Sequence, residues 1–303
     1  MKKYIFKIIL FAIIIVISDA LWGCFFRYWL HNINSGTIGK ANYISEQLDD
    51  DVLIFGPSRA EFHYNPMIIS DSLGMTCYNC GASGYGILAA FGRLSLIKEH
   101  HQPKIIIVEA SRDFDIITSD NNKYLGLFKS YYERGKITEL FNDIDSTQKY
   151  KMLSQMYRYN SNFTHNPITI FKPFYGKYKP DKLHGYSPQK EIFDSMKINL
   201  SHMNSNGEID SLKLRYIEKF IDLAQGSQLF FVSSPIWYGM SPEHLAPIKE
   251  ICSRRNIPFI DFSNNPKYVH NNAFFKDGKH LNKKGADEFT KDFVKTLRPM
   301  LKQ

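Results

Sequence analysis

Cysteine is scarce in this chain: four residues among 303, which excludes a disulfide framework. Cys77 and Cys80 form a CxxC pair, a spacing typical of a zinc half-site or a redox pair. A structural zinc site needs four ligands, however, and no second CxxC or HxxxH motif follows. We therefore expect two small residues at the end of a strand, and we expect neither a metal nor an organic cofactor.

Long runs of charge are also absent. The 38 basic and 30 acidic residues give a net charge of +8, and no five or six like charges follow one another. A mild, dispersed excess of this kind does not indicate a nucleic-acid partner. The chain is 44% hydrophobic and 22% charged, which excludes disorder, collagen and coiled coil. Aromatic residues make up 15%, which favours a broad core and some exposed stacking surface.

Polar residues are almost missing from one segment, residues 8–26, which follows the basic stretch 1–7. At 1.5 Å per residue this run reaches roughly 28 Å, about the thickness of a bilayer's hydrocarbon. A buried core helix would need a polar face, and this run has none before Asp19. We expect an uncleaved signal anchor in the inner membrane, with residues 1–7 cytoplasmic and residues 27–303 on the periplasmic side.

Two other fates of this segment are open. Ser18 and Ala20 are small residues at the right positions for cleavage after Ala20. The string Leu21-Trp22-Gly23-Cys24 resembles a lipoprotein box, although the bulky Trp22 beside the cysteine is atypical. The chain is exported in each case, and the alternatives differ only in how it is held.

Strand and helix patterns alternate after the anchor. Helices are expected at 37–48, 87–100, 242–255 and 283–301, and a further helix has Asn65 as N-cap, Pro66 at its first position and Gly74 at its end. Five short apolar runs predict buried strands at 51–55, 76–78, 104–108, 228–232 and 258–262. This order predicts an α/β fold: a three-layer α/β/α sandwich around a doubly wound, mainly parallel, five-stranded sheet.

A long insert, at about 120–205, separates the third and fourth strands and is too long for a plain crossover. One interpretation is a small helical subdomain whose aromatic residues form its own core. The other is a lid or platform whose rings stack on sugars. The aromatic residues concerned are Tyr131, Tyr132, Tyr157, Tyr159, Phe163, Phe171, Phe174, Tyr175, Tyr178 and Tyr186.

A serine follows the first strand directly, in Gly56-Pro57-Ser58-Arg59. Ligands of an open α/β sheet bind at the carboxyl ends of the strands, so Ser58 is expected at the mouth of the crevice. The motif is not the G-x-S-x-G elbow of α/β-hydrolases, because Ala60 stands where the second glycine would be. A GxS motif is also compatible with an ordinary turn serine. His63, a few residues later, is interpreted as a partly buried surface histidine without a role.

A second candidate group, Asp277-x-x-His280, lies just ahead of the last helix. An aspartate three residues before a histidine on one loop lets the carboxylate accept from one imidazole nitrogen. The other nitrogen then faces a nucleophile. Taken alone, His280 is equally compatible with a simple loop histidine.

Together these motifs resemble the SGNH (GDSL-like) hydrolase superfamily, from about Asp51 to about Lys302 without the aromatic insert. The first block reads D-V-L-I-F-G-P-S-R, with Pro57 in place of the usual residue before the nucleophile. The second block matches residues 78–84, so that Gly84 falls on the oxyanion-hole glycine. The last block matches Asp277 and His280. The resemblance implies a flavodoxin-like sheet and an esterase.

In the family's third block an asparagine donates to the oxyanion, and this chain has Asp113 there, next to Arg112. An ionised carboxylate donates nothing and repels an oxyanion. Arg112 or another group is therefore a candidate third donor, or the hole consists of the N–H groups of Ser58 and Gly84 alone. Loss of one donor typically costs about 10²–10³ in rate, which favours a weak esterase or a specific transferase over a promiscuous lipase.

The resemblance implies a mechanism in which Ser58 attacks an ester, His280 transfers the proton and Asp277 orients the imidazole. The expected substrate is an O-acylated cell-envelope or extracellular glycan, or a small ester. One alternative is an O-acetyltransferase that receives acyl groups from a membrane acyltransferase partner. The other is a catalytically inactive glycan-binding module on the same fold.

Overall fold

A computed structural model describes residues 1–34, 36–159, 182–190, 193 and 207–302. The chain divides into two compact units. The first unit comprises Met1–Glu46 and Asn121–Lys179, and the second comprises Gln47–Asp120 and Pro180–Gln303. Each unit therefore contains two stretches of chain that are separated in the sequence.

The second unit is built on a five-stranded parallel sheet in the order β2-β1-β3-β4-β5, which confirms the predicted fold class. This is the flavodoxin-like doubly wound order. All five strands lie where the sequence predicts them, with ends that differ by at most one residue. Their bounds are β1 Val52–Phe55, β2 Cys77–Asn79, β3 Ile105–Glu109, β4 Gln228–Ser233 and β5 Phe259–Asp261.

The strand order reverses between β1 and β3, which pair with Val52 opposite Ile105 and Phe55 opposite Val108. In such sheets the chain leaves neighbouring strands toward opposite faces at this point, which opens a crevice at the carboxyl ends. A ligand site is therefore expected in the loops that follow β1 and β3.

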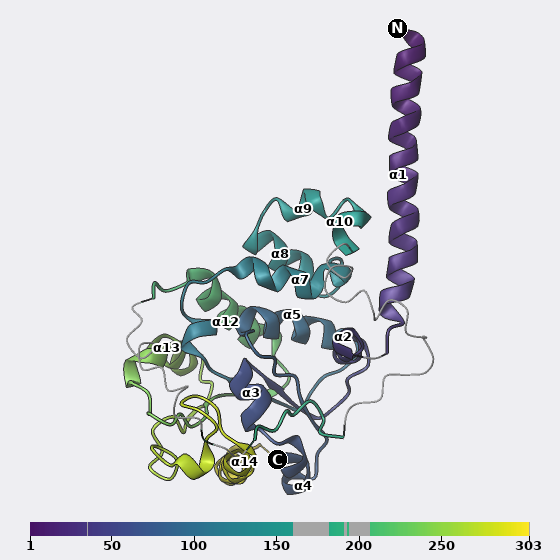
Figure 1. The fold of residues 1–303 in the computed structure, drawn as a ribbon. Helices are drawn as coiled ribbons and strands as arrows, with labels where there is room; N and C mark the ends of the chain where they lie inside the picture. Colours follow the sequence, from purple (N-terminus) through teal and green to yellow (C-terminus); the bar gives the residue numbers. More distant parts are fainter. Residues whose placement is uncertain (35, 160–181, 191–192, 194–206, 303) are drawn as a thin grey trace. The chain divides into compact units, whose positions relative to one another are not determined.

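Helices cover both faces of the sheet (Figure 1). Helices α3, α4 and α14 pack together, and their apolar residues join alternate strand residues such as Val52 and Ile54 in one buried core. Helices α5 and α12 pack on each other, and Phe55 of β1 meets Phe220 of α12. The helix bounds are α3 Ser58–His63, α4 Pro66–Leu73, α5 Ile87–Ile97, α6 Arg112–Asp115, α12 Ser211–Leu223, α13 Ala246–Arg254 and α14 Lys283–Leu297.

The predicted caps of α4 are confirmed. The Asn65 side chain accepts from the Met67 N–H at 3.1 Å, and Gly74 adopts a left-handed conformation with φ of 67°. Helix α12 is an element that the sequence interpretation omits. Its N-cap is Asp210, whose carboxylate accepts from the Leu212 and Lys213 N–H groups. An acidic cap ahead of an amphipathic run was the signal for it.

The first unit contains α1 Lys2–His31, α2 Gly36–Glu46 and the short helices of the insert. Helix α1 is long and apolar enough to cross a membrane and is hardly buried, which supports membrane anchoring in general. The insert helices are η1 Asn121–Tyr124, α7 Leu125–Phe128, η2 Lys129–Tyr131, α8 Ile137–Ile144, α9 Gln148–Lys151 and α10 Gln155–Tyr159.

The aromatic residues of the insert that the structure describes are mostly core residues. Tyr131, Tyr132 and Tyr159 are buried in the first unit, and Tyr186 is buried in the core of the second. Tyr157 is partly buried, with the Lys129 ammonium 4.0 Å from its ring centroid. These positions support the subdomain interpretation over a sugar platform. Phe163, Phe171, Phe174, Tyr175 and Tyr178 lie outside the described residues.

All four cysteines are free, and Cys77 and Cys80 are buried. Burial raises the pKa of the Cys77 thiol well above its ordinary value, and the nearby Asp50 adds to this. Within the described ranges, no group of three or more His, Cys, Asp or Glu side chains could hold a metal ion.

Candidate active site

The turn after β1 determines where Ser58 lies. Gly56 has a φ of 139°, and a Cβ atom there would meet the Glu109 backbone oxygen and the Glu109 Cβ, each at 2.9 Å. Only glycine combines this conformation with so close an approach to β3. Ser58 is then the first residue of α3, which begins shortly after β1 ends at Phe55.

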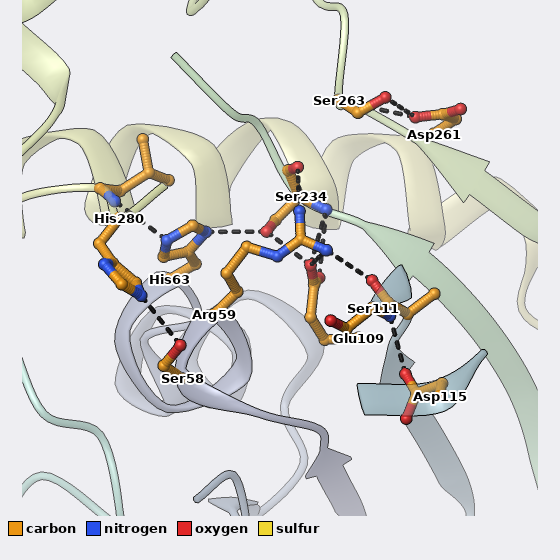
Figure 2. A network of polar contacts seen from close by, with 12 residues as sticks. Ser58, Arg59, His63, Glu109, Ser111, Asp115, Ser234, Asp261, Ser263 and His280 are labelled. Atoms are coloured by element: carbon orange, nitrogen blue, oxygen red, sulfur yellow. Dashed lines mark hydrogen bonds and ion pairs between the residues drawn. The ribbon is translucent and has the colours of Figure 1, made fainter. Parts of the chain in front are cut away.

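Ser58, His280 and Asp277 form one hydrogen-bonded chain. The Ser58 Oγ lies 2.9 Å from His280 Nε2, and His280 Nδ1 lies 3.0 Å from both carboxylate oxygens of Asp277. Figure 2 shows the first of these contacts. Residues 222 positions apart are brought together by the packing of α14, which follows the His280 loop, against α3. The structure thus joins the two sequence motifs.

The Asp277 carboxylate is organised by its own loop. Its Oδ1 accepts from the backbone N–H groups of Lys279 and His280, both at 2.9 Å. Burial alone would raise the pKa of Asp277, but the bonds to His280 and to the two N–H groups together lower it below its ordinary value. An ionised Asp277 requires His280 to donate from Nδ1, and this leaves Nε2 free to accept from the Ser58 hydroxyl.

A cavity of about 730 Å³ opens beside Ser58 and His280. It lies at the switch point between β1 and β3, because residues after both strands line it. Its volume is within the usual range for small-molecule sites. The lining residues are Pro57, Ser58, Arg59, Ser111, Arg112, Asp113, Phe114, Ile236, Tyr238, Gly239, Met240, Ser241, Glu243, His244, Lys279 and His280.

The three further residues predicted for an oxyanion hole have different positions. Arg112 and Asp113 line the cavity, and Gly84 is not among its lining residues. Gly84 has a φ of 84° and follows Ser83, whose N–H and hydroxyl both donate to the Glu61 carboxylate of α3. The Asp113 carboxylate pairs with the Lys279 ammonium at 3.2 Å, so its charge has a cationic neighbour on the His280 loop.

The sequence analysis does not predict a buried polar network that meets the cavity at Arg59. Glu109, the last residue of β3, is fully buried and lies 3.0 Å from the Arg59 guanidinium. It also accepts from the hydroxyls of Tyr64 at 2.5 Å and Ser234 at 2.8 Å. Burial raises the pKa of Glu109, although Arg59 and these donors oppose the shift. An acidic residue directly after a run of four apolar strand residues was the available signal.

His63 belongs to this network, and its interpretation as a partly buried surface histidine was wrong. It is completely buried because α14 packs over the end of α3. Its Nε2 accepts from the Leu281 N–H at 3.0 Å, and its Nδ1 therefore donates to the Ser234 Oγ at 2.8 Å. Burial, His280 and Arg59 all lower the pKa of His63 well below its ordinary value, so His63 stays neutral. The contact to Leu281 holds the backbone beside His280.

Two other titratable groups near the cavity are shifted. Burial raises the pKa of Asp115 to about 6, although its carboxylate accepts from the Ser111 and Ile87 N–H groups at 2.7 Å each. Burial raises the pKa of Tyr238 to about 12, with opposition from Arg59 and a further increase from Asp113 and Asp277. At neutral pH Asp115 is therefore mainly ionised and accepts from the two N–H groups, and Tyr238 is a neutral phenol.

Taken together, the geometry provides a nucleophile, a base and an orienting carboxylate in a chain, next to a cavity. These are the elements of acyl transfer to a serine, and the chemistry requires no metal or organic cofactor.

No protein-family model matches the sequence, and no curated protein matches it. Solved structures do resemble it at low identity. One is a protein from Streptococcus pneumonia whose description names platelet activating factor, 10% identical, with a TM-score of 0.39 over 98% of this chain and 99% of that chain. Another is the acetyl xylan esterase Est2A from the rumen bacterium Butyrivibrio proteoclasticus, 10% identical, with a TM-score of 0.35 over 82% of this chain and 63% of that chain. Likeness of this degree carries no argument about function.

Proposed function

We propose that this protein is a serine-dependent esterase that removes acyl groups from an O-acylated glycan or a small ester. One observation carries the proposal: Ser58 Oγ lies 2.9 Å from His280 Nε2, and His280 Nδ1 lies 3.0 Å from Asp277, at the edge of a cavity of about 730 Å³. Composition and fold alone do not distinguish an enzyme from a binding module, whereas this chain of contacts has an obvious chemical use.

In the proposed reaction the Ser58 oxygen attacks the ester carbonyl and its proton passes to His280 Nε2. The tetrahedral intermediate collapses when the bond to the alcohol breaks, and the alcohol leaves with that proton. Water then attacks the acyl-serine by the same route in reverse, with His280 as base, and releases the carboxylic acid. Asp277 keeps the imidazole in the required tautomer and stabilises the imidazolium.

The oxyanion is assigned first to the backbone N–H group of Ser58, because Ser58 lines the cavity and Gly84 does not. Arg112 is the proposed second donor, since it lines the cavity and carries a positive charge. Asp113 opposes an oxyanion less than an isolated carboxylate would, because Lys279 partly compensates its charge. We propose that the enzyme is accordingly a slow, selective esterase.

The proposed substrate is an acylated carbohydrate of the cell envelope or its surroundings. A mixed lining with Tyr238, Phe114, Arg112 and Glu243 suits a polar ring that needs both stacking and hydrogen bonds. The apolar helix α1 would hold the enzyme at the inner membrane, with its second unit on the periplasmic side.

A fluorophosphonate probe tests the serine mechanism directly, because it forms a covalent bond only with an activated serine. We expect full-length protein to be labelled and Ser58→Ala to be unlabelled with an unchanged melting temperature. The matched control is Ser253→Ala, an exposed serine of α13, which should label like the wild type. Equal labelling of Ser58→Ala would refute the assignment, and an unlabelled wild type would indicate a binding module.

The fate of the acyl group separates an esterase from an acetyltransferase. A p-nitrophenyl acetate assay with and without a glycan acceptor measures whether water or a sugar hydroxyl takes the acyl group. Release of acetate at the same rate in both conditions supports the esterase. Acetylation of the glycan at the expense of free acetate would assign the protein as a transferase, with a membrane acyltransferase as the proposed donor.

A further inference from the structure

Helix α1 carries one acidic residue, Asp19, inside its apolar run. Asp19 lies about 16 Å along the helix axis from Ile8, and about one turn before Trp22. Since a bilayer's hydrocarbon is about 30 Å thick, a spanning α1 places Asp19 between the bilayer centre and the aromatic residues that mark the interface. A bare carboxylate at that depth is costly and needs a partner.

The partner is the start of helix α10 in the insert. Asp19 accepts from the Ser154 hydroxyl at 2.9 Å and from the backbone N–H groups of Gln155 and Met156 at 2.7 and 2.8 Å. A Cβ atom at Gly23 would lie 2.5 Å from the Gln155 side chain, so the two helices are in direct contact one turn further along α1. The first turn of α10 therefore lies at the depth of Asp19, beside the anchor.

Three apolar side chains are exposed around this contact, beside the exposed Lys149 and Lys151. Leu153 is 77% exposed, and Tyr150 and Met156 are more than half exposed. On α1 itself the apolar side chains of Leu21 and Phe25 remain exposed beyond Asp19. Exposed apolar side chains are thus present both on α1 and on the segment 148–156, where they alternate with basic residues.

We propose that residues 148–156, which we call the α9–α10 tip, dock into the bilayer leaflet at the C-terminal end of α1. Tyr150, Leu153 and Met156 would be in contact with lipid. Lipid is the occupant that fits, because α1 already brings this surface to the membrane and Asp19 attaches it to α1. Lys149 lies in the same segment and Lys151 pairs with Asp145 at 2.9 Å. Basic residues beside apolar anchors suit the headgroups of anionic lipids. This proposal is independent of the proposed esterase activity.

Site-specific labelling in vesicles tests the docking. A Leu153→Cys variant in a Cys24→Ala background leaves only buried native cysteines, so an environment-sensitive fluorophore reacts at residue 153. The full chain is reconstituted into vesicles of phosphatidylethanolamine and phosphatidylglycerol that contain lipid with a nitroxide near the headgroup. The matched control is Lys136→Cys, an exposed site of the same unit, next to α8.

We expect the nitroxide lipid to quench the label at 153 at least about twofold more strongly than the label at 136, since docked apolar residues lie roughly 5–10 Å into the headgroup and acyl boundary. Adding Asp19→Leu should reduce the quenching at 153 to the control level and leave the protein in the membrane fraction. Equal quenching at 153 and 136 would overturn the proposal. A label at 153 that is shielded from water but not quenched would also overturn it, because a protein would then cover the tip.

Discussion

Two clusters in the second unit each contain one serine, one histidine and one carboxylate, and they differ in order and in exposure. In the cavity cluster His280 stands in the middle, between Ser58 and Asp277. The imidazole can take a proton from the serine while the carboxylate supports the resulting charge. The His280 and Asp277 side chains are 25% and 15% exposed, so a substrate can reach them.

In the buried cluster the serine stands in the middle. The Ser234 hydroxyl accepts from His63 and donates to Glu109, and all three side chains are completely buried. A hydroxyl whose proton is already bonded to a carboxylate, and which no substrate can reach, is not a nucleophile. Both clusters have the same residue types. What separates a candidate reactive serine from a structural one is therefore the order of the hydrogen bonds and the access to the cavity.

The largest expected effect is on the cavity cluster. Asp277→Asn should lower kcat for p-nitrophenyl acetate by about 10⁴-fold, because the neutral amide no longer enforces the His280 tautomer or stabilises the imidazolium. Its oxygen can still accept from the two backbone N–H groups, so the melting temperature should change little. Steady-state kinetics beside Asp71→Asn, an exposed residue of α4, measures this. An unchanged kcat would mean that another group orients His280.

Glu109→Gln, in the buried cluster, should lower the free energy of unfolding. It removes the counter-charge of Arg59, whose side chain is 8% exposed, and breaking a buried ion pair typically costs about 3–5 kcal/mol. Urea unfolding measures the loss, with the exposed Glu250→Gln of α13 as control. A free energy of unfolding within about 1 kcal/mol of the wild type would show that the pair does not hold the end of β3.

Two neighbouring serines, Ser233 and Ser234, should differ in their contribution to the free energy of unfolding. Ser234→Ala removes the hydroxyl that accepts from His63 and donates to Glu109. Its loss should lower the free energy of unfolding by about 1–3 kcal/mol. Ser233→Ala is the matched control, because the Ser233 hydroxyl is buried and has no hydrogen-bond partner among the residues that the structure describes. Its loss should be neutral or slightly stabilising. If the two variants unfold at the same denaturant concentration, the bonds of Ser234 contribute nothing.

The smallest expected effect concerns Asp115, whose pKa is raised to about 6 by burial. Between about pH 4 and about pH 6 the folded state keeps a proton that the unfolded state has lost, so this group makes the free energy of unfolding fall as pH rises. Asp115→Asn cannot titrate and should remove up to about 1.4 kcal/mol per pH unit from that slope. Urea unfolding across this window measures the slopes. Identical slopes in both proteins would contradict the shift.

Much of this arrangement could be predicted from local patterns. Continuous apolar runs predicted all five strands, and the Asn65 cap and the Gly74 end of α4 are as expected. Asp277 and His280 are three residues apart on one loop, so their contact depends on local geometry. The apolar run of α1 is likewise a property of consecutive residues.

The rest depended on tertiary structure. Ser58 meets His280 because α14 packs on α3, and Arg59, Glu109 and Ser234 meet because three separate segments converge at the ends of β1, β3 and β4. Lys279 reaches Asp113 across 166 residues, a contact that no local pattern indicates. Hydrogen bonds and ion pairs act over about 3 Å, while sequence patterns report only which face of an element is apolar. Sequence therefore determined the five strands and the candidate residues of the cavity cluster, and packing alone decided which serine has a histidine to activate it.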